Sequence, residues 1–374
     1  MVLTDWYLPA YKAGGPVKSL AALAHHLKDD YNFYILTSNK DAFSKNVLPV
    51  KSDEWLTLSN GEKVYYLSDE KISISKLADV INQVDYDFVY LNSFFSKYFS
   101  IYPLLLKKQG KIKKPVMLAP RGMLGEGALS LKSKKKNLFI NLSKLSGIHK
   151  NITWHATSQQ EVEEIKKTFG SSAQIHLASN LILLPTLQRT NYSKNPGELK
   201  ICFISRISKK KNLLFALEIL KSIDVGKITF DVYGPAEDFG YNQDCLQFSK
   251  HLPKNISVFF KGDLQPLEVE GVLKQNHVFF LPTLNENFGH AIVEAMLNGC
   301  IPLLSDQTPW KNLKNNELGW AIPLQDKSAF IAAINVSLSM NEITFKSQSL
   351  KIQRFALENC IHQAHIEAYR QLFK

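Results

Sequence analysis

Residues 276–300 read NHVFFLPTLNENFGHAIVEAMLNGC and join a strand-like run, Asn276–Pro282, to an amphipathic helix. Gly289 separates the two elements, and a residue without a side chain lets the backbone come close to a ligand. A helix start also presents free N–H groups and the positive end of the helix dipole. The pattern therefore predicts an anion site at this turn, with Glu286 just before the helix and Glu294 inside it. The same two acids are equally consistent with a helix cap and an exposed surface residue.

A second strand–loop–helix segment carries a basic run. Ile201–Ser205 has the unbroken apolar pattern of a buried strand, and the loop Arg206–Asn212 that follows holds one arginine and three lysines. A leucine-rich helix comes next. Basic groups at the carboxyl end of a strand are well placed to bind a diphosphate. The alternative is a solvated basic turn, which is the commoner fate of lysine runs.

The amino-terminal segment Asp5–Pro16 ends in two adjacent glycines, Gly14 and Gly15, before a helix expected at Val17–Leu27. The pair lets the main chain pass close to a phosphate group. Polar residues follow other strand-like runs in the same half of the chain, at Asn92, Arg121 and His155. We expect these residues to lie at the carboxyl ends of their strands.

Taken together, these segments resemble the retaining glycosyltransferases of family 4, and in particular bacterial members that build exopolysaccharide, capsule or lipopolysaccharide. The resemblance implies the α/β GT-B fold, with two doubly wound Rossmann-like domains and a ligand cleft between them. In that family an arginine and a lysine spaced as Arg206 and Lys211 hold the donor diphosphate. Two glutamates spaced as Glu286 and Glu294 line the donor pocket, and the second binds the ribose.

The resemblance also implies a set of site residues. Catalytic roles fall on Arg206, Lys211 and Glu286. Donor-binding roles fall on Gly14, Gly15, Gly234, Gly262, Leu264, Asn287, Phe288, Gly289, His290 and Glu294. The acceptor-side candidates are Asn92, Arg121 and His155. Arg121 stands in a region where many family members have a histidine, and His155 is equally well explained as a structural histidine with satisfied hydrogen bonds.

The expected reaction transfers a hexosyl or N-acetylhexosaminyl group from a UDP- or GDP-sugar to a saccharide or lipid-linked saccharide. The resemblance implies retention at the anomeric carbon by a front-face mechanism, without an enzyme nucleophile, metal or cofactor. Asp85-Tyr86-Asp87 matches a metal-binding motif of other glycosyltransferases, but it precedes the strand Phe88–Leu91 and so lies at the wrong end of it. The alternative function is a GT-B-shaped sugar-nucleotide binder or epimerase without transferase activity.

The order of the expected elements implies two domains. Strand-like and helix-like segments alternate over residues 1–187 and again over residues 199–345. The polar, turn-rich stretch 188–198 predicts a linker. Residues 346–374 are expected to form a helix that crosses back to the first domain, as in the family.

Composition agrees with a two-domain enzyme of the cytoplasm. The chain has 374 residues, of which 45% are hydrophobic, enough for two substantial cores. No apolar run reaches the roughly 18 residues of a membrane span. The four cysteines are scattered without a paired spacing, which indicates buried, reduced thiols.

The formal net charge of +11 is concentrated in part on one segment. Leu131–Leu145 interleaves Leu138, Phe139 and Leu142 with the lysines Lys132, Lys134, Lys135, Lys136 and Lys144. This pattern suits a basic amphipathic helix that lies on the anionic inner face of the cytoplasmic membrane. An ordinary helix with a solvated face is the alternative. A nucleic-acid surface is a third reading, but no recognition motif supports it.

Overall fold

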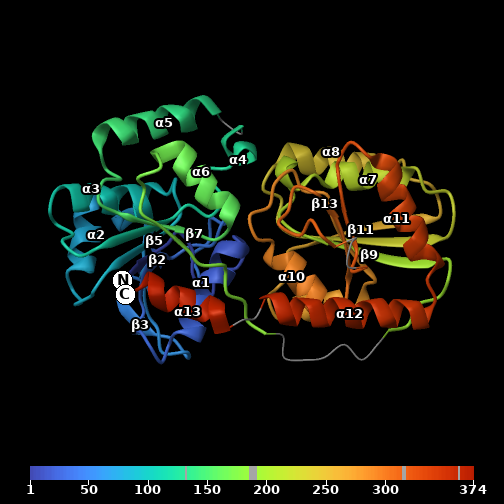
Figure 1. Ribbon diagram of the computed structural model, residues 1–374, viewed down its shortest axis with the longest axis horizontal. Helices are drawn as coiled ribbons and strands as arrows, with labels where there is room; N and C mark the ends of the chain where they lie inside the picture. The colour runs from blue at the N-terminus through green and yellow to red at the C-terminus, as the bar shows by residue number, and fades with distance from the viewer. Residues whose placement is uncertain (131–132, 185–191, 314–316, 361–362) are drawn as a thin grey trace. The chain divides into compact units, whose positions relative to one another are not determined.

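The computed structural model describes residues 1–130, 133–184, 192–313, 317–360 and 363–374. The chain forms two compact units, which Figure 1 shows in ribbon form. The first unit contains Met1–Ile182 together with His362–Lys374, and the second contains Leu183–Ile361. Helices alternate with strands in both units, as expected when helices cover the faces of a parallel sheet.

The first unit, in its described part, holds an eight-stranded sheet in the order β3-β4-β2-β1-β5-β6-β7-β8. Its strands are β1 Val2–Leu3, β2 Tyr34–Ser38, β3 Trp55–Thr57, β4 Lys63–Leu67, β5 Val89–Asn92, β6 Val116–Ala119, β7 Thr153–Ala156 and β8 Ile175–Leu177. Only β3 pairs antiparallel among these strands, at the edge beside β4. The buried two-residue β1 lies in the middle of the sheet, paired with β2 and β5.

Both faces of this sheet are buried. Leu3 and Leu91 belong to one apolar cluster, whereas their chain neighbours Val2 and Tyr90 belong to another. Successive side chains of a strand point to opposite faces, so each cluster fills one side of the sheet. The helices of this unit are α1 Gly15–His26, α2 Ile74–Ile81, α3 Tyr102–Lys108, α4 Glu126–Ser130, α5 Ser133–Ser146, α6 Gln159–Phe169 and α13 Gln363–Leu372, with short turns of helix at Asp69–Lys71 and Lys97–Ile101.

The helix α13 brings the end of the chain into the first unit. Phe373, just after α13, stacks on Phe88 with ring centroids 4.8 Å apart. Tyr369 is fully buried in the same cluster, and Arg370 pairs with Asp30 at 2.9 Å. The expected single helix over 346–374 is therefore wrong in detail. The chain forms α12 Glu342–Cys360 in the second unit and α13 in the first, and residues 361–362 lie outside the described part.

The second unit contains, where the chain is described, a six-stranded parallel sheet in the order β11-β10-β9-β12-β13-β14. Its strands are β9 Glu198–Ile204, β10 Lys227–Tyr233, β11 Ile256–Gly262, β12 Val278–Leu281, β13 Ile301–Ser305 and β14 Trp320–Ile322. Its helices are α7 Leu213–Lys221, α8 Phe239–Ser249, α9 Val269–Gln275, α10 His290–Leu297, α11 Lys327–Ser339 and α12, with a short turn of helix at Lys209–Lys211. β12 and β13 are almost wholly apolar, and so is β9 from Ile201 onward, as strands buried on both faces should be.

The order of strands reverses at one point in each sheet. β1 lies between β2 and β5, and β9 lies between β10 and β12. The connections that leave two such neighbours diverge to opposite faces of the sheet, which opens a ligand site beyond their carboxyl ends. Functional residues are therefore expected after β1 and β5 in the first unit, and after β9 and β12 in the second.

Part of the predicted linker 188–198 is packed against the second unit. Residues 185–191 lie outside the described part of the chain. Lys194 is buried, and its Nζ donates to the carbonyl oxygens of Leu338 and Met340 at 3.3 and 3.0 Å, at the end of α11. This contact satisfies carbonyl groups that a helix end leaves unpaired, so the stretch around Lys194 is packed against the second unit.

The four cysteines are buried and none forms a disulfide, as predicted. In the described ranges, no helix combines the length and the apolar character needed to cross a lipid bilayer. The helix α6 begins at Gln159, and at its amino-terminal cap the Ser158 side chain accepts a hydrogen bond from the backbone N–H of Glu161.

Candidate functional site

The loops after β9 and β12 are joined to each other by hydrogen bonds. The carbonyl oxygen of Lys210 accepts from the backbone N–H of Leu284 at 2.8 Å and from the Thr283 hydroxyl at 3.1 Å. Thr283 and Leu284 follow β12, whereas Lys210 follows β9. The pairing holds the basic loop against the acidic loop at the point where the strand order reverses.

Lys211 and Glu286 meet across this junction. The Lys211 ammonium forms an ion pair and a short hydrogen bond with a carboxylate oxygen of Glu286. Both side chains are largely buried, with exposed fractions of 11% and 17%. Burial alone would raise the pKa of Glu286, but the attraction of Lys211, supported by Lys210 and Arg206, outweighs it and keeps that pKa below its ordinary value. The two residues most strongly implied by the resemblance therefore lie together.

Two further cations lie in the same group. Arg206 pairs with Glu237 at 3.1 Å, and both side chains remain about one-third exposed. Lys210 lies beside Lys211 and Arg206, and burial, helped by the repulsion of Lys211, lowers its pKa to about 8. With Lys210 protonated, three positive groups face two carboxylates. A net positive charge at the carboxyl ends of parallel strands suits a bound diphosphate.

Gly289 shapes the start of α10. It is the N-cap residue in the left-handed conformation, with φ +82°, and no side chain caps the helix. A Cβ at this position would lie 2.7 Å from the Ile292 side chain and 3.2 Å from the Glu286 side chain. Glycine therefore allows the Glu286 loop to approach the helix start, where backbone N–H groups and the helix dipole favour an anion.

The residues around Gly289 are held by an aromatic brace. The Trp310 indole N–H donates to the carbonyl oxygen of Phe288 at 2.8 Å. The Phe288 ring lies 4.8 Å from the imidazole of His290, centroid to centroid. Asn287, Phe288, His290 and Glu294 are all partly exposed, and Glu294 lies in the second turn of α10. These predicted donor-binding residues thus share one loop and one helix.

Gly234 follows β10, the neighbour of β9, and Gly262 ends β11, which lies on the other side of β10. The N–H of Gly234 donates to the carbonyl oxygen of Gly262 at 2.8 Å. A Cβ on Gly234 would stand only 2.0 Å from the carbonyl oxygen of Ser205, whereas a Cβ on Gly262 would meet open space. Gly234 is therefore required for the close approach of two backbones. Leu264, two residues after Gly262, is partly exposed.

In the first unit, the acceptor-side candidates Asn92, Arg121 and His155 are connected through Tyr90. The Arg121 guanidinium donates to the Asn92 side chain at 2.6 Å and to the Tyr90 hydroxyl at 2.9 Å. It also forms a short hydrogen bond with Asn180. The Tyr90 hydroxyl in turn lies 2.7 Å from Nδ1 of His155. Arg121 adopts the left-handed conformation, φ +57°, which is uncommon for residues other than glycine.

The hydrogen bonds of His155 define its tautomer. Nε2 lies 2.8 Å from the carbonyl oxygen of Ala178, which can only accept, so Nε2 carries the proton and Nδ1 accepts from Tyr90. Burial, together with the nearby Arg121 charge, lowers the pKa of His155 to about 3. Both nitrogens are engaged and the ring is fully buried. This is the arrangement of a structural histidine, one of the two roles expected from the sequence.

Gly14 and Gly15 begin α1, in the connection that leaves β1. Gly14 is the N-cap at φ +69°, without a side-chain cap, and Gly15 is the first helical residue. Open space surrounds the position that a Gly14 Cβ would take. Nearby, the Ser96 hydroxyl donates to the Asp5 carboxylate at 2.7 Å. The bond joins the loops that leave β1 and β5, the two strands at which the order reverses.

Sequence reasoning missed Glu237, Lys210, Trp310 and Tyr90. Glu237, Trp310 and Tyr90 contribute through partners distant in the chain, so local patterns carried no signal for them. Lys210 was visible as part of the basic run, but only its burial distinguishes it from the exposed Lys209.

Asp85 and Asp87 are exposed and precede β5, as predicted. No group of three or more His, Cys, Asp or Glu suited to a metal occurs in the described ranges.

Comparison with known proteins supports the sequence resemblance. Residues 186–349, which fall within the second unit, match the family model described as Glycosyl transferases group 1. A Klebsiella pneumoniae protein described as "Uncharacterized 41.2 kDa protein in cps region" is 25% identical over 167 residues. That alignment covers 43% of this chain and 38% of the relative's own length.

Solved structures confirm the fold class. Sucrose-phosphate synthase from Thermosynechococcus elongatus superposes with a TM-score of 0.70 at 16% identity, over 96% of this chain and 94% of that chain. Anabaena Alr3699/HepE in complex with UDP and glucose gives a TM-score of 0.71 at 14% identity, over 99% of this chain and 98% of that chain. The protein therefore has the α/β fold of the GT-B glycosyltransferases, with two Rossmann-like domains.

Proposed function

We propose that the protein is a retaining glycosyltransferase of family 4. It would move a hexosyl or N-acetylhexosaminyl group from a nucleotide diphosphate to a saccharide or lipid-linked saccharide in cell-surface polysaccharide synthesis. The observation that carries this proposal is the group formed by Arg206, Lys210, Lys211 and Glu286 beside β9 and β12. It places positive charge where an open parallel sheet binds ligands.

The comparisons support the proposal in different ways. The group 1 match covers the unit that holds the charged group. Anabaena Alr3699/HepE was also solved in complex with UDP-glucose, a sugar nucleotide of the class proposed as donor for this chain. The Klebsiella relative comes from a cps region, which favours a role in surface polysaccharide assembly. The inner face of the cytoplasmic membrane is the proposed place of action.

In the proposed mechanism, Arg206 and Lys211 bind the donor diphosphate. Glu286 orients Lys211 through its carboxylate, and the remaining N–H groups of the ammonium contact phosphate oxygens. The uncapped start of α10 at Gly289 adds backbone N–H groups to the same anion. Glu294 binds the ribose hydroxyls, while Glu286 and His290 orient the donor sugar.

The chemical step breaks the bond between the anomeric carbon and the phosphate oxygen, and the electron pair leaves with the nucleoside diphosphate. The acceptor hydroxyl attacks the same face of the sugar, and its proton passes to the departing phosphate. Negative charge grows on the leaving oxygens in the transition state. Arg206 and Lys211 stabilise that charge more than they stabilise the ground state, which is the condition for catalysis.

An assay of UDP- and GDP-sugars with a lipid-linked saccharide acceptor tests the proposal. We expect one donor to raise the melting temperature, because a ligand that binds only the folded state stabilises it. The same donor should be consumed only when acceptor is present, with the anomeric configuration retained. Donor binding without transfer would favour the sugar-nucleotide binder or epimerase instead.

Glu294→Ala should weaken donor binding more than it slows turnover. Hydrogen bonds from ribose hydroxyls to the carboxylate persist from ground state to transition state, so their loss raises KM rather than lowering kcat. The donor Kd should rise about ten- to a hundredfold, since hydrogen bonds to charged groups contribute about 1.5–3 kcal/mol. Calorimetry measures the effect. Glu294→Gln retains one acceptor oxygen, so its donor Kd should lie between those of the wild-type protein and Glu294→Ala. Unchanged donor affinity in Glu294→Ala would contradict the ribose role.

Treatment with EDTA should leave transfer activity intact. Arg206, Lys210 and Lys211 supply the positive charge that a divalent ion supplies in other transferases. Asp85 and Asp87 are exposed at the amino-terminal end of β5, away from the carboxyl ends where ligands bind. Activity is measured after chelation and again after adding Mg²⁺ or Mn²⁺. Loss of turnover that either ion restores would refute metal independence.

The proposed membrane contact now rests on a defined surface of α5. Leu138, Leu142 and Leu145 are spaced as one helical stripe, and 61%, 55% and 85% of their areas are exposed. Lys134 and Lys135 are exposed near the start of the same helix. An apolar stripe beside basic residues is the composition of a helix that lies in an anionic lipid surface. In Figure 1, α5 lies at the edge of the first unit.

Two of the residues predicted to lie on this surface of α5 are turned toward other parts of the protein. Phe139 packs inward, with ring centroids 5.8 Å from Phe94 and 5.7 Å from Phe95. Lys136 forms a short hydrogen bond with the Ala128 carbonyl oxygen, while Lys144 is exposed and reaches over the Phe169 ring. Lys132 lies outside the described residues. Phe139 was therefore wrongly assigned to the lipid-facing side, because it contacts Phe94 and Phe95, which are distant in the chain. Lys136 is drawn to the neighbouring helix α4 instead.

Replacing Lys134 and Lys135 together by glutamine should lower binding to anionic vesicles by about thirtyfold, since each lysine near such a surface contributes about 1 kcal/mol. Replacing Leu138, Leu142 and Leu145 by serine should weaken it further. Vesicle flotation measures both effects. Leu267→Ser is a matched control, because that leucine is 96% exposed in the second unit. Equal recovery on neutral and anionic vesicles ends the membrane proposal and leaves the transferase proposal standing.

A further inference from the structure

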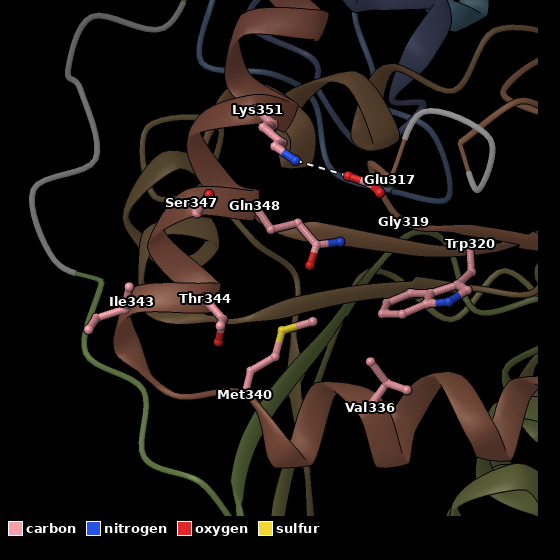
Figure 2. Close-up of a pocket in the computed structure, with 10 residues that line it drawn as sticks. All are labelled: Glu317, Gly319, Trp320, Val336, Met340, Ile343, Thr344, Ser347, Gln348 and Lys351. Carbon is pink, nitrogen blue, oxygen red and sulfur yellow. Dashed lines mark hydrogen bonds and ion pairs between the residues drawn. The ribbon is translucent and has the colours of Figure 1, made fainter.

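A hollow of about 530 Å³ lies within the second unit (Figure 2), and its lining includes none of the residues of the candidate site. It is formed by the edge strand β14, the end of α11 and the first turns of α12. Volumes of this size are typical of small-molecule sites. Gly319 allows this arrangement, because a Cβ there would lie 2.4 Å from the carbonyl oxygen of Pro302 in β13. The close approach of β14 to β13 sets Trp320 at the wall of the hollow.

One part of the hollow is apolar. The indole of Trp320 and the side chains of Val336 and Met340 gather there, as Figure 2 shows. Ile343 extends the apolar surface on α12. Val336 is 49% exposed and Ile343 is 80% exposed, whereas Phe330 and Ile334 of α11 and Phe345 and Ile352 of α12 are buried. The hydrophobic effect favours covering such a group of exposed apolar side chains.

The other part is polar but carries no net charge. Ser347 and Gln348 lie along α12, and in Figure 2 the Gln348 amide points into the hollow. Lys351 and Glu317 form an ion pair of 3.0 Å, so their charges cancel. Throughout the part of the chain that the structure describes, the side chains of Trp320, Ser347 and Gln348 form no hydrogen bond with other protein groups. Their polar atoms are available to a ligand.

We infer that this hollow binds a neutral pyranose unit of a saccharide. A pyranose ring has a face of C–H groups and a rim of hydroxyls. The face fits an indole ring and the aliphatic side chains beside it, while the rim can exchange hydrogen bonds with Gln348, Ser347 and the indole N–H. The cancelled charges offer little to a phosphate or a carboxylate. The site goes beyond the proposed function and does not depend on it.

The indole ¹⁵N–¹H spectrum of the whole protein tests this inference. The chain has five tryptophans, and Trp320→Phe identifies the signal of Trp320 by its loss. The probes are methyl α-D-glucopyranoside, methyl β-D-galactopyranoside and maltotetraose, each titrated in the presence of saturating UDP. We expect at least one saccharide to shift the Trp320 signal with a Kd of about 1 mM, the range of a small, shallow site. UDP fills only the nucleotide part of the donor site, so the Gln348→Ala variant described below is needed to distinguish binding in the hollow from saccharide binding elsewhere.

Two variants make the result specific. Gln348→Ala removes one rim partner on a helix that tolerates alanine, and the saccharide Kd should rise about three- to tenfold, as for one lost hydrogen bond. Glu358→Ala, at an exposed position of the same helix, is the control and should leave the Kd unchanged. UDP binding should be the same in all three proteins.

Three results would overturn the inference. The first is a Trp320 signal that no saccharide shifts at up to about 50 mM, a concentration well above the expected Kd. The second is a shift that Gln348→Ala leaves unaltered. The third is a response to hexanol but to none of the saccharides, which would make the hollow an apolar site. None of these three results would count against the donor-binding role of the candidate site. Likewise, an absence of glycosyl transfer would not count against saccharide binding in the hollow.

Discussion

Lys211→Met should reduce turnover at saturating donor by about a hundred- to a thousandfold, the loss seen when one preorganised donor of an electrostatic site is removed. Methionine retains most of the aliphatic volume, so the change removes mainly the charge and its hydrogen bonds. The ammonium lies against Glu286 at the point where β9 and β12 are neighbours. Steady-state kinetics with the productive donor, reported as kcat and KM separately, measure the loss.

Lys209→Met is the matched control for that prediction. Lys209 belongs to the same run but is exposed, and it should keep nearly full activity. Removing Lys211 also leaves the Glu286 carboxylate without its cation, which destabilises a buried pair. The double variant Lys211→Met with Glu286→Gln removes that unpaired charge, so its melting temperature should recover while its activity stays low. Near-normal kcat in Lys211→Met would show that the lysine serves the fold alone.

Gly234→Ala should destabilise the second unit by several kcal/mol. The added Cβ would stand 2.0 Å from the Ser205 carbonyl oxygen and 2.6 Å from its carbon, at a φ of +133°. Unfavourable backbone conformations cost about 1–3 kcal/mol, and overpacking adds a further 1–3 kcal/mol or more. Because whole domains are stable by only about 5–15 kcal/mol, the variant should open β9 and β10 readily. Hydrogen exchange of those strands measures the change directly.

Comparison with Gly262→Ala shows how much of the cost of Gly234→Ala comes from steric overlap and how much from backbone strain. Gly262 also has a positive φ, +75°, but open space surrounds its Cβ position. Its substitution should therefore cost only about 1–2 kcal/mol, the price of a left-handed non-glycine residue. Equal destabilisation by both substitutions would mean that φ strain, and not the contact with Ser205, makes Gly234 necessary.

Residues that act through neighbours in the chain were predictable. Gly289 between Glu286 and a helix, and a basic loop after an apolar strand, are short-range patterns with a direct physical meaning. The glycine pair Gly14 and Gly15 at the start of α1 followed for the same reason. These positions depend on local dihedral angles and on hydrogen bonds within one turn, so a single sequence contains the information.

Residues that act across the fold were not predictable. Glu237 meets Arg206 only because β10 lies beside β9, and Trp310 meets Phe288 through a bond between two separate loops. In α5, the sequence pattern predicted that Leu138 and Phe139 would both face the lipid surface. Contacts with Phe94 and Phe95 then turned Phe139 inward, while Leu138 stayed 61% exposed. Which side of a helix meets the core depends on the surface that the rest of the chain presents.

The sequence by itself determined the strand–loop–helix segments of this protein and the chemistry that each loop carries, because turns, caps and apolar periods are local. Only the tertiary structure decided which loops are neighbours. Lys211 and Glu286 lie 75 positions apart, and they meet because β9 pairs with β12 and Lys210 accepts from Leu284. Strand order results from burying both faces of the sheet with all of its helices at once. That requirement acts over the whole unit, and no window of sequence expresses it.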